Sequence, residues 1–279
     1  NEVILQRPHG IDFAHLSRFT GAKIVEVGTA DKLSEQDIEL AINDRTAAIL
    51  HIILDPQPGT VSLERIIEIG KRHHIPVVVD AAAELPPVDN LSKFISMGAD
   101  LVVFSGGKAI GGPNDSGFIC GRKDLIHACA LNGFPSESVI GRTMKISKEQ
   151  IVGLVVALQR YAEKDHEADM ERWKAMTNWL VDELSGIPHV KAVPVFPSKG
   201  PRPLCIPRVE VTWDERALNK STLDVVNSLK SGDPAIEVAN PEHSIGEERI
   251  HINPQCLRDG EEKIVATRLQ EIFSEFSLS

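Results

Sequence analysis

Strand-like and helix-like segments alternate along the first 121 residues of this 279-residue chain. The strand-like runs are short and rich in Val, Ile and Leu, as in strands that are buried in a parallel sheet. The alternation predicts an α/β fold, with a mainly parallel sheet and helices on both of its faces. We expect strands at 3–6, 23–27, 47–53, 76–80, 101–105 and 118–120, and helices at 13–20, 35–42, 63–73 and 91–97.

The second half of the chain has a different pattern. Ser147 and Gln150 have the spacing of a capping box and start a helical pattern that runs to about residue 185. One long helix and two helices separated by a kink fit this pattern equally well. After a Pro-rich stretch at 194–207, we expect a strand at 208–213, a helix at 220–231, a strand at 249–253 and a helix at 259–276. These segments predict a smaller α+β C-terminal lobe.

The predicted elements suggest three parts. Residues 1–160 would form a large domain, 161–200 a connecting helix and linker, and 201–279 a small C-terminal α+β domain. Because the chain enters a strand at once, we expect a further N-terminal part of the large domain upstream of Asn1.

The composition argues against several classes of function. The formal net charge of −10 does not suit a surface for nucleic acid or anionic membranes, which needs a basic footprint. No apolar run approaches the length of a membrane span. The cysteines form no Cys-x-x-Cys pair and no metal-ligand spacing, which favours reduced thiols. We therefore expect a cytoplasmic protein with no nucleic-acid partner, no membrane partner and no metal site.

Two of the predicted strands lead into polar groups. The run Val77-Val78-Val79 ends at Asp80, and the strand at 101–105 is followed by two glycines and Lys108. Such groups lie at the carboxyl edge of a parallel sheet, where ligands of α/β proteins bind. The alternatives are that Asp80 caps the next helix and that the Gly-Gly-Lys segment is a solvated turn. Small residues after Asp80 and glycines on both sides of Lys108 favour a ligand site.

A carboxylate and a lysine at one sheet edge suit pyridoxal 5'-phosphate (PLP). The lysine amine can form a Schiff base, and the carboxylate can keep the pyridine nitrogen protonated so that the ring accepts electrons. We therefore predict that Lys108 attaches PLP and that Asp80 binds its ring nitrogen.

Five segments of the chain resemble fold-type-I PLP enzymes. The resemblance is to the selenocysteine synthase (L-seryl-tRNA selenium transferase)-like family, in its short branch with glucosaminate-6-phosphate ammonia-lyase. It covers residues 1–160 well and the last lobe loosely. The segments are Gly21-Ala22-Lys23-Ile24-Val25-Glu26-Val27-Gly28-Thr29, Asp80-Ala81-Ala82, Phe104-Ser105-Gly106-Gly107-Lys108, Gly111-Gly112-Pro113-Asn114 and Arg142-Thr143-Met144-Lys145.

The resemblance implies roles for individual residues. Lys108 would be the catalytic lysine that holds PLP, and Asp80 would be the partner of the ring nitrogen. Ser105 would bind the cofactor phosphate, Ala82 would pack against the ring face, and Gly107 would belong to the same cofactor-binding loop.

Arg142 and Lys145 match an Arg-x-x-Lys segment near the active site of such enzymes. The resemblance implies that these two cations bind an anionic substrate, and the planar fork of arginine suits a carboxylate or a phosphate. A solvated loop is an equally good interpretation of the segment.

Two departures weaken the hypothesis of selenium transfer. The chain is acidic and has no extra nucleic-acid-binding region, and it reads Ala30-Asp31-Lys32 where the selenium-inserting enzymes tend to have Thr-Asn-Arg. In addition, the phosphate-binding loop and ring-stacking residue that such enzymes carry upstream of this first strand have no counterpart in the sequence.

The leading hypothesis is a PLP-dependent lyase of the ammonia-lyase type. It would perform α,β-elimination on a small anionic β-hydroxy amino acid, such as an amino-sugar acid, and give a keto acid and ammonia. The alternatives are a PLP-dependent aminotransferase, a transferase that replaces a group at Cβ with sulfur or selenium, and a truncated non-catalytic relative. We also expect a homodimer or higher homo-oligomer with shared active sites, with the loop at 111–114 at the subunit boundary.

Overall fold

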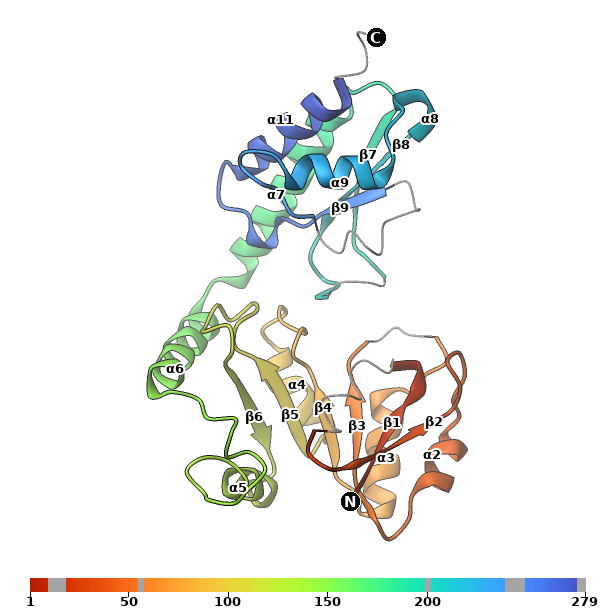
Figure 1. The fold of residues 1–279 in the computed structure, drawn as a ribbon, viewed down its shortest axis with the longest axis vertical. Helices are drawn as coiled ribbons and strands as arrows, with labels where there is room; N and C mark the ends of the chain where they lie inside the picture. The colour runs from red at the N-terminus through yellow and green to blue at the C-terminus, as the bar shows by residue number, and fades with distance from the viewer. Residues whose placement is uncertain (10–18, 55–57, 199–201, 239–248, 275–279) are drawn as a thin grey trace. The chain divides into compact units, whose positions relative to one another are not determined.

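The structure is a computed structural model, and it describes residues 1–9, 19–54, 58–198, 202–238 and 249–274 (Figure 1). The chain divides into two compact units, Asn1–Lys164 and Asp165–Ser279. The segment predicted as a connection, 161–200, includes helix α7 (His166–Leu184) and strand β7 (Val190–Val195), and both belong to the second unit. Within the described ranges, no helix combines the length and the apolar character needed to cross a membrane.

A six-stranded sheet forms the centre of the first unit (Figure 1). Its strands are parallel except for the last, which runs antiparallel to its neighbour. The predicted mainly parallel α/β sheet is therefore confirmed. In sheet order, the strands are β2 (Lys23–Val27), β1 (Glu2–Gln6), β3 (Thr46–Ile52), β4 (Val77–Asp80), β5 (Leu101–Ser105) and β6 (Gly117–Gly121).

Apolar side chains of the central strands form the core of this unit with the helices that connect them. Ile4, Ile49 and Val79 are fully buried in one cluster with Ile66 of α3. Leu5 and Ile52 form a second, smaller cluster, because successive side chains of a strand point to opposite faces. The helices of the unit are α2 (Glu35–Ala41), α3 (Leu63–His73), α4 (Asn90–Met97), α5 (Lys123–Leu131) and α6 (Lys148–Glu163).

The helices agree with the sequence-based expectations in part. Ser147 and Gln150 form the expected capping box at the start of α6. The long helical pattern is two helices, because α6 ends at Glu163 and the Asp165 side chain caps α7. Helix α5 was not predicted, and most of the helix expected at 13–20 lies outside the described residues.

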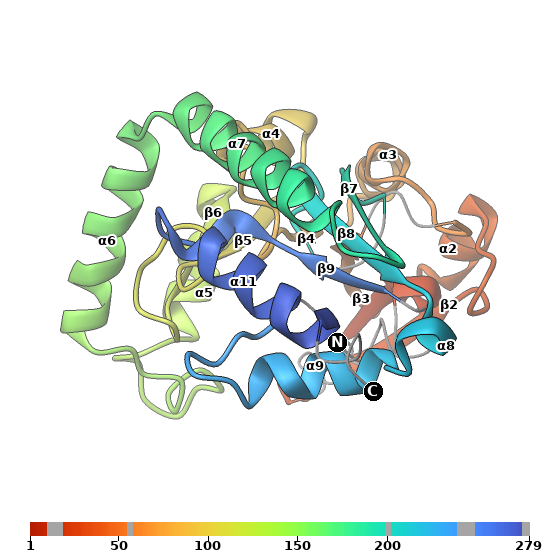
Figure 2. The same cartoon turned by 90° about the horizontal axis from the view of Figure 1, so that it is seen from above.

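The second unit is the α+β lobe that the sequence predicts. An antiparallel sheet in the order β7, β8 (Arg208–Trp213), β9 (Arg249–Ile252) shares one apolar core with three helices. These are α7, α9 (Thr222–Lys230) and α11 (Glu261–Ser274), and α11 contacts both α7 and α9 (Figure 2). The sequence analysis missed β7 because it contains Pro194, but proline is compatible with an edge strand. A short helix, α8 (Glu215–Leu218), follows β8.

Candidate active site

Asp80 ends β4 at the carboxyl edge of the large sheet and is half-buried. Its Oδ1 atom accepts a hydrogen bond from the Ala82 N–H at 3.0 Å. Its backbone carbonyl accepts the N–H of Ile53, the residue after the neighbouring strand β3, also at 3.0 Å. The next helix, α4, starts only at Asn90 with Asp89 as its N-cap residue, so Asp80 does not cap a helix. The carboxylate is fixed by a local turn, and Oδ2 makes no hydrogen bond to any described residue.

Ser105 and Lys108 follow on the adjacent strand. Ser105 is the last residue of β5 and is half-buried, and Lys108 is exposed on the turn directly after it. Asp80 pairs with Val103 in the sheet register, so β4 and β5 end side by side. The structure therefore brings Asp80, Ser105 and Lys108 to the same sheet edge. Ala82 lies half-buried on the turn that follows Asp80.

The glycines around Lys108 have a structural reason of their own. A Cβ atom at Gly107 would lie 2.5 Å from the Asn114 Cα, and a Cβ at Gly106 would collide with the Ser116 hydroxyl. The Gly106 N–H donates to the Ser116 carbonyl at 2.8 Å, and the Gly106 carbonyl accepts the Gly112 N–H at 2.8 Å. The glycines allow a tightly folded loop, and this loop gives the backbone of Lys108 a defined position.

Arg142 and Lys145 are placed differently. Both side chains are exposed and lie over the ring of Phe134, with Arg142 Cζ at 5.0 Å and Lys145 Nζ at 4.8 Å from its centroid. Their segment follows helix α5. The chain enters α5 from the end of β6, and this end of β6 pairs with the start of β5. Neither cation makes a hydrogen bond or ion pair with Asp80 or Lys108 within the described part of the chain.

The sequence analysis missed a polar cluster in the second unit. Glu210 Oε2 lies 3.2 Å from Arg249 Nη1 and 3.2 Å from His251 Nε2. Burial lowers the pKa of the His251 imidazole, although the adjacent Glu210 carboxylate acts in the opposite direction. Arg208 is fully buried two positions before Glu210, and this burial lowers the pKa of its guanidinium. Arg208 and Glu210 are two positions apart on one predicted strand, as are Arg249 and His251 on another. This spacing could have indicated that the four side chains share one face of the small sheet.

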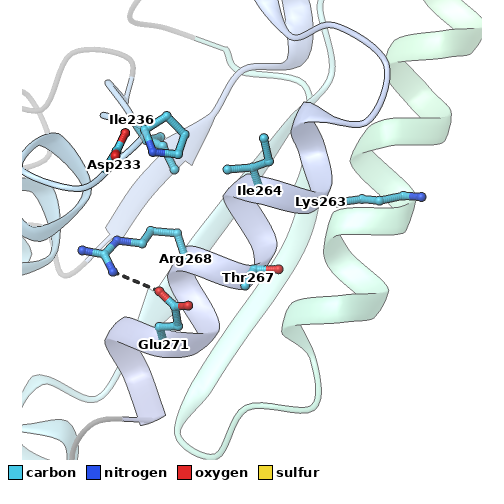
Figure 3. A pocket seen from close by; sticks show the side chains of 8 residues that line it. Asp233, Ile236, Lys263, Ile264, Thr267, Arg268 and Glu271 are labelled. Atoms are coloured by element: carbon cyan, nitrogen blue, oxygen red, sulfur yellow. Dashed lines mark hydrogen bonds and ion pairs between the residues drawn. The ribbon is translucent and has the colours of Figure 1, made fainter.

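A cavity of about 290 Å³ lies in the second unit and contains none of the predicted site residues (Figure 3). Arg268 in this cavity donates to Glu271 at 2.9 Å, so these two charges compensate each other. The side chain of Lys263 points away from Arg268. The lining residues are Asp233, Pro234, Ile236, Lys263, Ile264, Thr267, Arg268 and Glu271. The cavity offers no lysine and carboxylate pair at a sheet edge, so we do not assign the active site to it.

The residues at the carboxyl edge fit PLP in three respects. Lys108 offers an exposed primary amine on an ordered loop, and Asp80 has a carboxylate oxygen without a hydrogen bond to a described residue. Ser105 adds a hydroxyl group at the end of the adjacent strand β5. Among the residues that the structure describes, no group of three or more His, Cys, Asp or Glu side chains could hold a metal ion.

Structural similarity shows that the chain has the fold of the fold-type-I PLP enzymes. Aspartate aminotransferase of Thermus thermophilus superposes with a TM-score of 0.51 at 18% identity, over 97% of this chain and 69% of that chain. A serine palmitoyltransferase of S. paucimobilis with bound PLP gives a TM-score of 0.57 at 15% identity, over 98% of this chain and 66% of that chain. At these identities, the similarity establishes the fold alone.

Sequence similarity defines the family. The chain belongs to the L-seryl-tRNA selenium transferase (SelA) family, whose model matches residues 14–183. It is 33% identical to D-glucosaminate-6-phosphate ammonia lyase of Salmonella typhimurium, over 98% of this chain and 70% of the relative. A solved structure of D-glucosaminate-6-phosphate ammonia-lyase has a TM-score of 0.80 at 31% identity, over 99% of this chain and 72% of that chain.

The name of another relative indicates a different reaction. The chain is 33% identical to 5'-C-glycyluridine monooxygenase-decarboxylase of Streptomyces sp., over 98% of this chain and 67% of the relative. The two relatives are equally similar in sequence, so identity alone does not select between their reactions.

Proposed function

We propose that this chain belongs to a PLP-dependent ammonia-lyase that performs α,β-elimination on a small anionic β-hydroxy amino acid, such as an amino-sugar acid. The products would be a keto acid and ammonia. The observation that carries the proposal is the convergence of Asp80, Ser105 and Lys108 at one sheet edge. The similarity to D-glucosaminate-6-phosphate ammonia lyase over nearly the whole chain supports it.

Each residue of the edge has a distinct task in this proposal. Bound PLP would supply an electron sink for the negative charge that develops at the substrate Cα. The Lys108 amine would hold the cofactor and, in its neutral form, would accept the Cα proton. The Asp80 carboxylate would hold the ring nitrogen of the cofactor in its protonated form, and the Ser105 hydroxyl would donate to the cofactor phosphate.

We further propose that Arg142 and Lys145 bind the anionic group of a substrate held in a second copy of the chain. The helix before their segment, α5, starts at the sheet edge opposite to Lys108, and neither cation makes a hydrogen bond or ion pair with Asp80 or Lys108 within the described residues. The chain would then act as a homodimer or higher homo-oligomer with shared active sites, and no nucleic acid or membrane would take part.

Exposed apolar side chains in this region support an assembly. Helix α5 has the largely apolar sequence KDLIHACAL, yet none of its residues is buried. Four residues of α6, at positions that share one face of a helix, are also exposed: Ile151 53%, Val152 63%, Val155 52% and Val156 49%. Soluble monomers rarely expose apolar patches of this extent, and a second copy would cover them.

Product analysis tests the proposed reaction. The assembled, PLP-loaded protein incubated with D-glucosaminate 6-phosphate should release ammonia and a keto acid in equal amounts, without an added amino acceptor. A requirement for a keto-acid acceptor would instead indicate aminotransfer, and a requirement for a sulfur or selenium nucleophile would indicate replacement at Cβ. Oxygen consumption with release of CO₂ from an amino acid would favour the chemistry named for the Streptomyces relative.

A further inference from the structure

Helix α6 packs against the loop that carries Lys108. This loop, residues 106–116, joins β5 to β6, and we call it the lysine loop. Its Ile110 is buried in the core of the first unit, and Leu154 and Ala157 of α6 pack against the same cluster. Because Leu154 and Ala157 are three positions apart, they share one face of the helix. The proposed reaction gives α6 no task.

Two glycines of the lysine loop allow α6 to come close. A Cβ atom at Gly106 would lie 2.5 Å from Cδ1 of Leu154, and a Cβ at Gly112 would lie 3.5 Å from the Leu154 Cα. The Gly112 N–H donates to the Gly106 carbonyl at 2.8 Å, which closes the loop. Within it, the Lys108 carbonyl accepts the Gly111 N–H at 2.9 Å. The helix therefore contacts the loop on both sides of Lys108.

A glycine of the helix itself provides a second close contact. A Cβ at Gly153 would lie 3.0 Å from Cγ of Pro113 in the lysine loop. The Pro113 carbonyl accepts the hydroxyl group of the buried Ser116 at 2.6 Å and its N–H at 3.0 Å. Pro113 is thus held between the helix and Ser116. Glycine weakens a helix relative to alanine, so the close approach of Pro113, and not helix formation, explains Gly153.

Gln150 joins the start of α6 to the end of the lysine loop. Its Oε1 atom accepts the Ser147 N–H at 2.8 Å, as part of the capping box, and its Nε2 atom donates to Oδ2 of Asp115. The two ends of this amide cannot be exchanged, because the Ser147 N–H needs an acceptor and the carboxylate needs a donor. One side chain therefore caps the helix and holds the loop.

We propose that Gln150 and Gly153 are positioning residues of the candidate site, through which α6 holds the lysine loop and sets the point from which the Lys108 amine reaches its cofactor. A lysine side chain has many rotamers, so a fixed backbone raises the fraction of time that the amine lies within reach. The consequence for the cofactor rests on the proposed function, whereas the hold of α6 on the loop does not. Gln150 and Gly153 are half-buried and lie outside the exposed apolar face of α6.

Hydrogen exchange of the protein without PLP tests this hold directly. Gln150→Glu keeps an acceptor for the Ser147 N–H, but it removes the donor to Asp115 and places two carboxylates together. The amides of the lysine loop should then exchange about tenfold faster, because the loop opens more often. Gln159→Glu adds the same charge at an exposed position of α6 and is the matched control. Unchanged exchange of the loop in Gln150→Glu would overturn the proposal.

A double variant separates the hydrogen bond from the added charge. Gln150→Glu together with Asp115→Asn exchanges the donor and the acceptor, because the asparagine amide can donate to the new carboxylate. The net charge then equals that of the unsubstituted protein. The lysine loop should regain its slow exchange. Exchange as fast as in Gln150→Glu alone would contradict a hydrogen-bonded link between the helix and the loop.

Gly153→Ala tests the second contact in a variant whose helix should form at least as well. The added Cβ must displace the Pro113 ring, while alanine raises the helix propensity of α6. We expect faster exchange in the lysine loop without a lower melting temperature. Unchanged exchange would exclude Gly153 from the proposed role.

The absorption spectrum of bound PLP tests the consequence for the site. Gln150→Glu should weaken PLP binding by roughly threefold to tenfold and shift the pH dependence of the spectrum, and the double variant should restore both. Faster exchange of the loop with an unchanged PLP affinity and spectrum would show that α6 only stabilises the fold, which would refute the positioning role. Failure of the unsubstituted protein to bind PLP would contradict the proposed function, while the exchange rates would still decide whether α6 holds the loop.

Discussion

Asp80 and Lys108 carry most of the proposed chemistry at the scale of single residues, and their surroundings explain why. The Asp80 carboxylate is fixed by one hydrogen bond from the Ala82 N–H and has a second oxygen available. Lys108 is exposed, but its backbone belongs to a loop in which Gly107 packs against Asn114. A fixed carboxylate and an accessible amine on an ordered backbone are the features that a preorganised cofactor site requires.

Replacement of Lys108 should abolish turnover. Lys108→Ala removes the attachment point and the proton acceptor together, and Lys108→Arg should do no better because a guanidinium stays protonated. The measurement is the steady-state rate of ammonia release with PLP in excess. Lys191→Ala, at an exposed lysine of β7, is the matched control and should keep the full rate. Substantial activity in Lys108→Ala would refute the assignment.

Asp80→Asn should lower kcat by about two to three decades, which corresponds to roughly 3–4 kcal/mol of transition-state stabilisation. Asparagine keeps an oxygen that can accept the Ala82 N–H, so the turn and the unfolding free energy should be preserved. Rates from purified variant and wild-type protein, each with its denaturation curve, provide the test. Unchanged kinetics would mean that Asp80 serves only the turn.

At the scale of elements, the sequence predicted the ends of the central strands better than the contacts between distant segments. β4 and β5 are short apolar runs whose ends are visible in the sequence, so the positions of Asp80 and Lys108 follow from strand direction alone. The sequence analysis missed β7 because it contains Pro194. Proline is tolerated at a sheet edge, but only the strand pairing shows that β7 is an edge strand. The hydrogen bond between Gln150 and Asp115 joins residues 35 positions apart, so no local pattern indicates it.

The loop that carries Lys108 should be sensitive to an added methyl group. In Gly107→Ala, the new Cβ would meet the Asn114 backbone at 2.5 Å, and relieving this contact should cost about 1–3 kcal/mol of unfolding free energy. Gly186→Ala is the control, because a Cβ there has no atom within 4 Å. Denaturant unfolding of both variants should separate them, and equal stability would show that the loop adapts without strain.

At the scale of the whole molecule, the proposed shared active site requires more than one copy of the chain. Arg142 and Lys145 lie over Phe134 in a region where α5 has no buried residue and α6 exposes four apolar side chains. A face of this kind is better explained by association than by solvation. The sequence shows which residues of α5 and α6 are apolar, but it does not show whether they are buried within one chain.

Val155→Glu on the exposed face of α6 should therefore weaken the assembly. A carboxylate placed in an apolar interface loses its hydration without gaining a partner, which favours dissociation. Sedimentation should detect smaller species at micromolar concentration, together with lower activity and an unchanged folded signal. Leu223→Glu, at a leucine of α9 that is 47% exposed in the second unit, is the control. A wild-type monomer with PLP bound and full activity would contradict the shared-site proposal.

The central claim is that Lys108 holds the cofactor, and one measurement tests it most directly. The protein is incubated with PLP, reduced with borohydride to make the attachment permanent, digested, and its peptides are mapped by mass spectrometry. The account predicts a pyridoxyl group on Lys108 and none on the other lysines. A pyridoxyl group on Lys123 or Lys145, or no modified lysine after reduction, would contradict it.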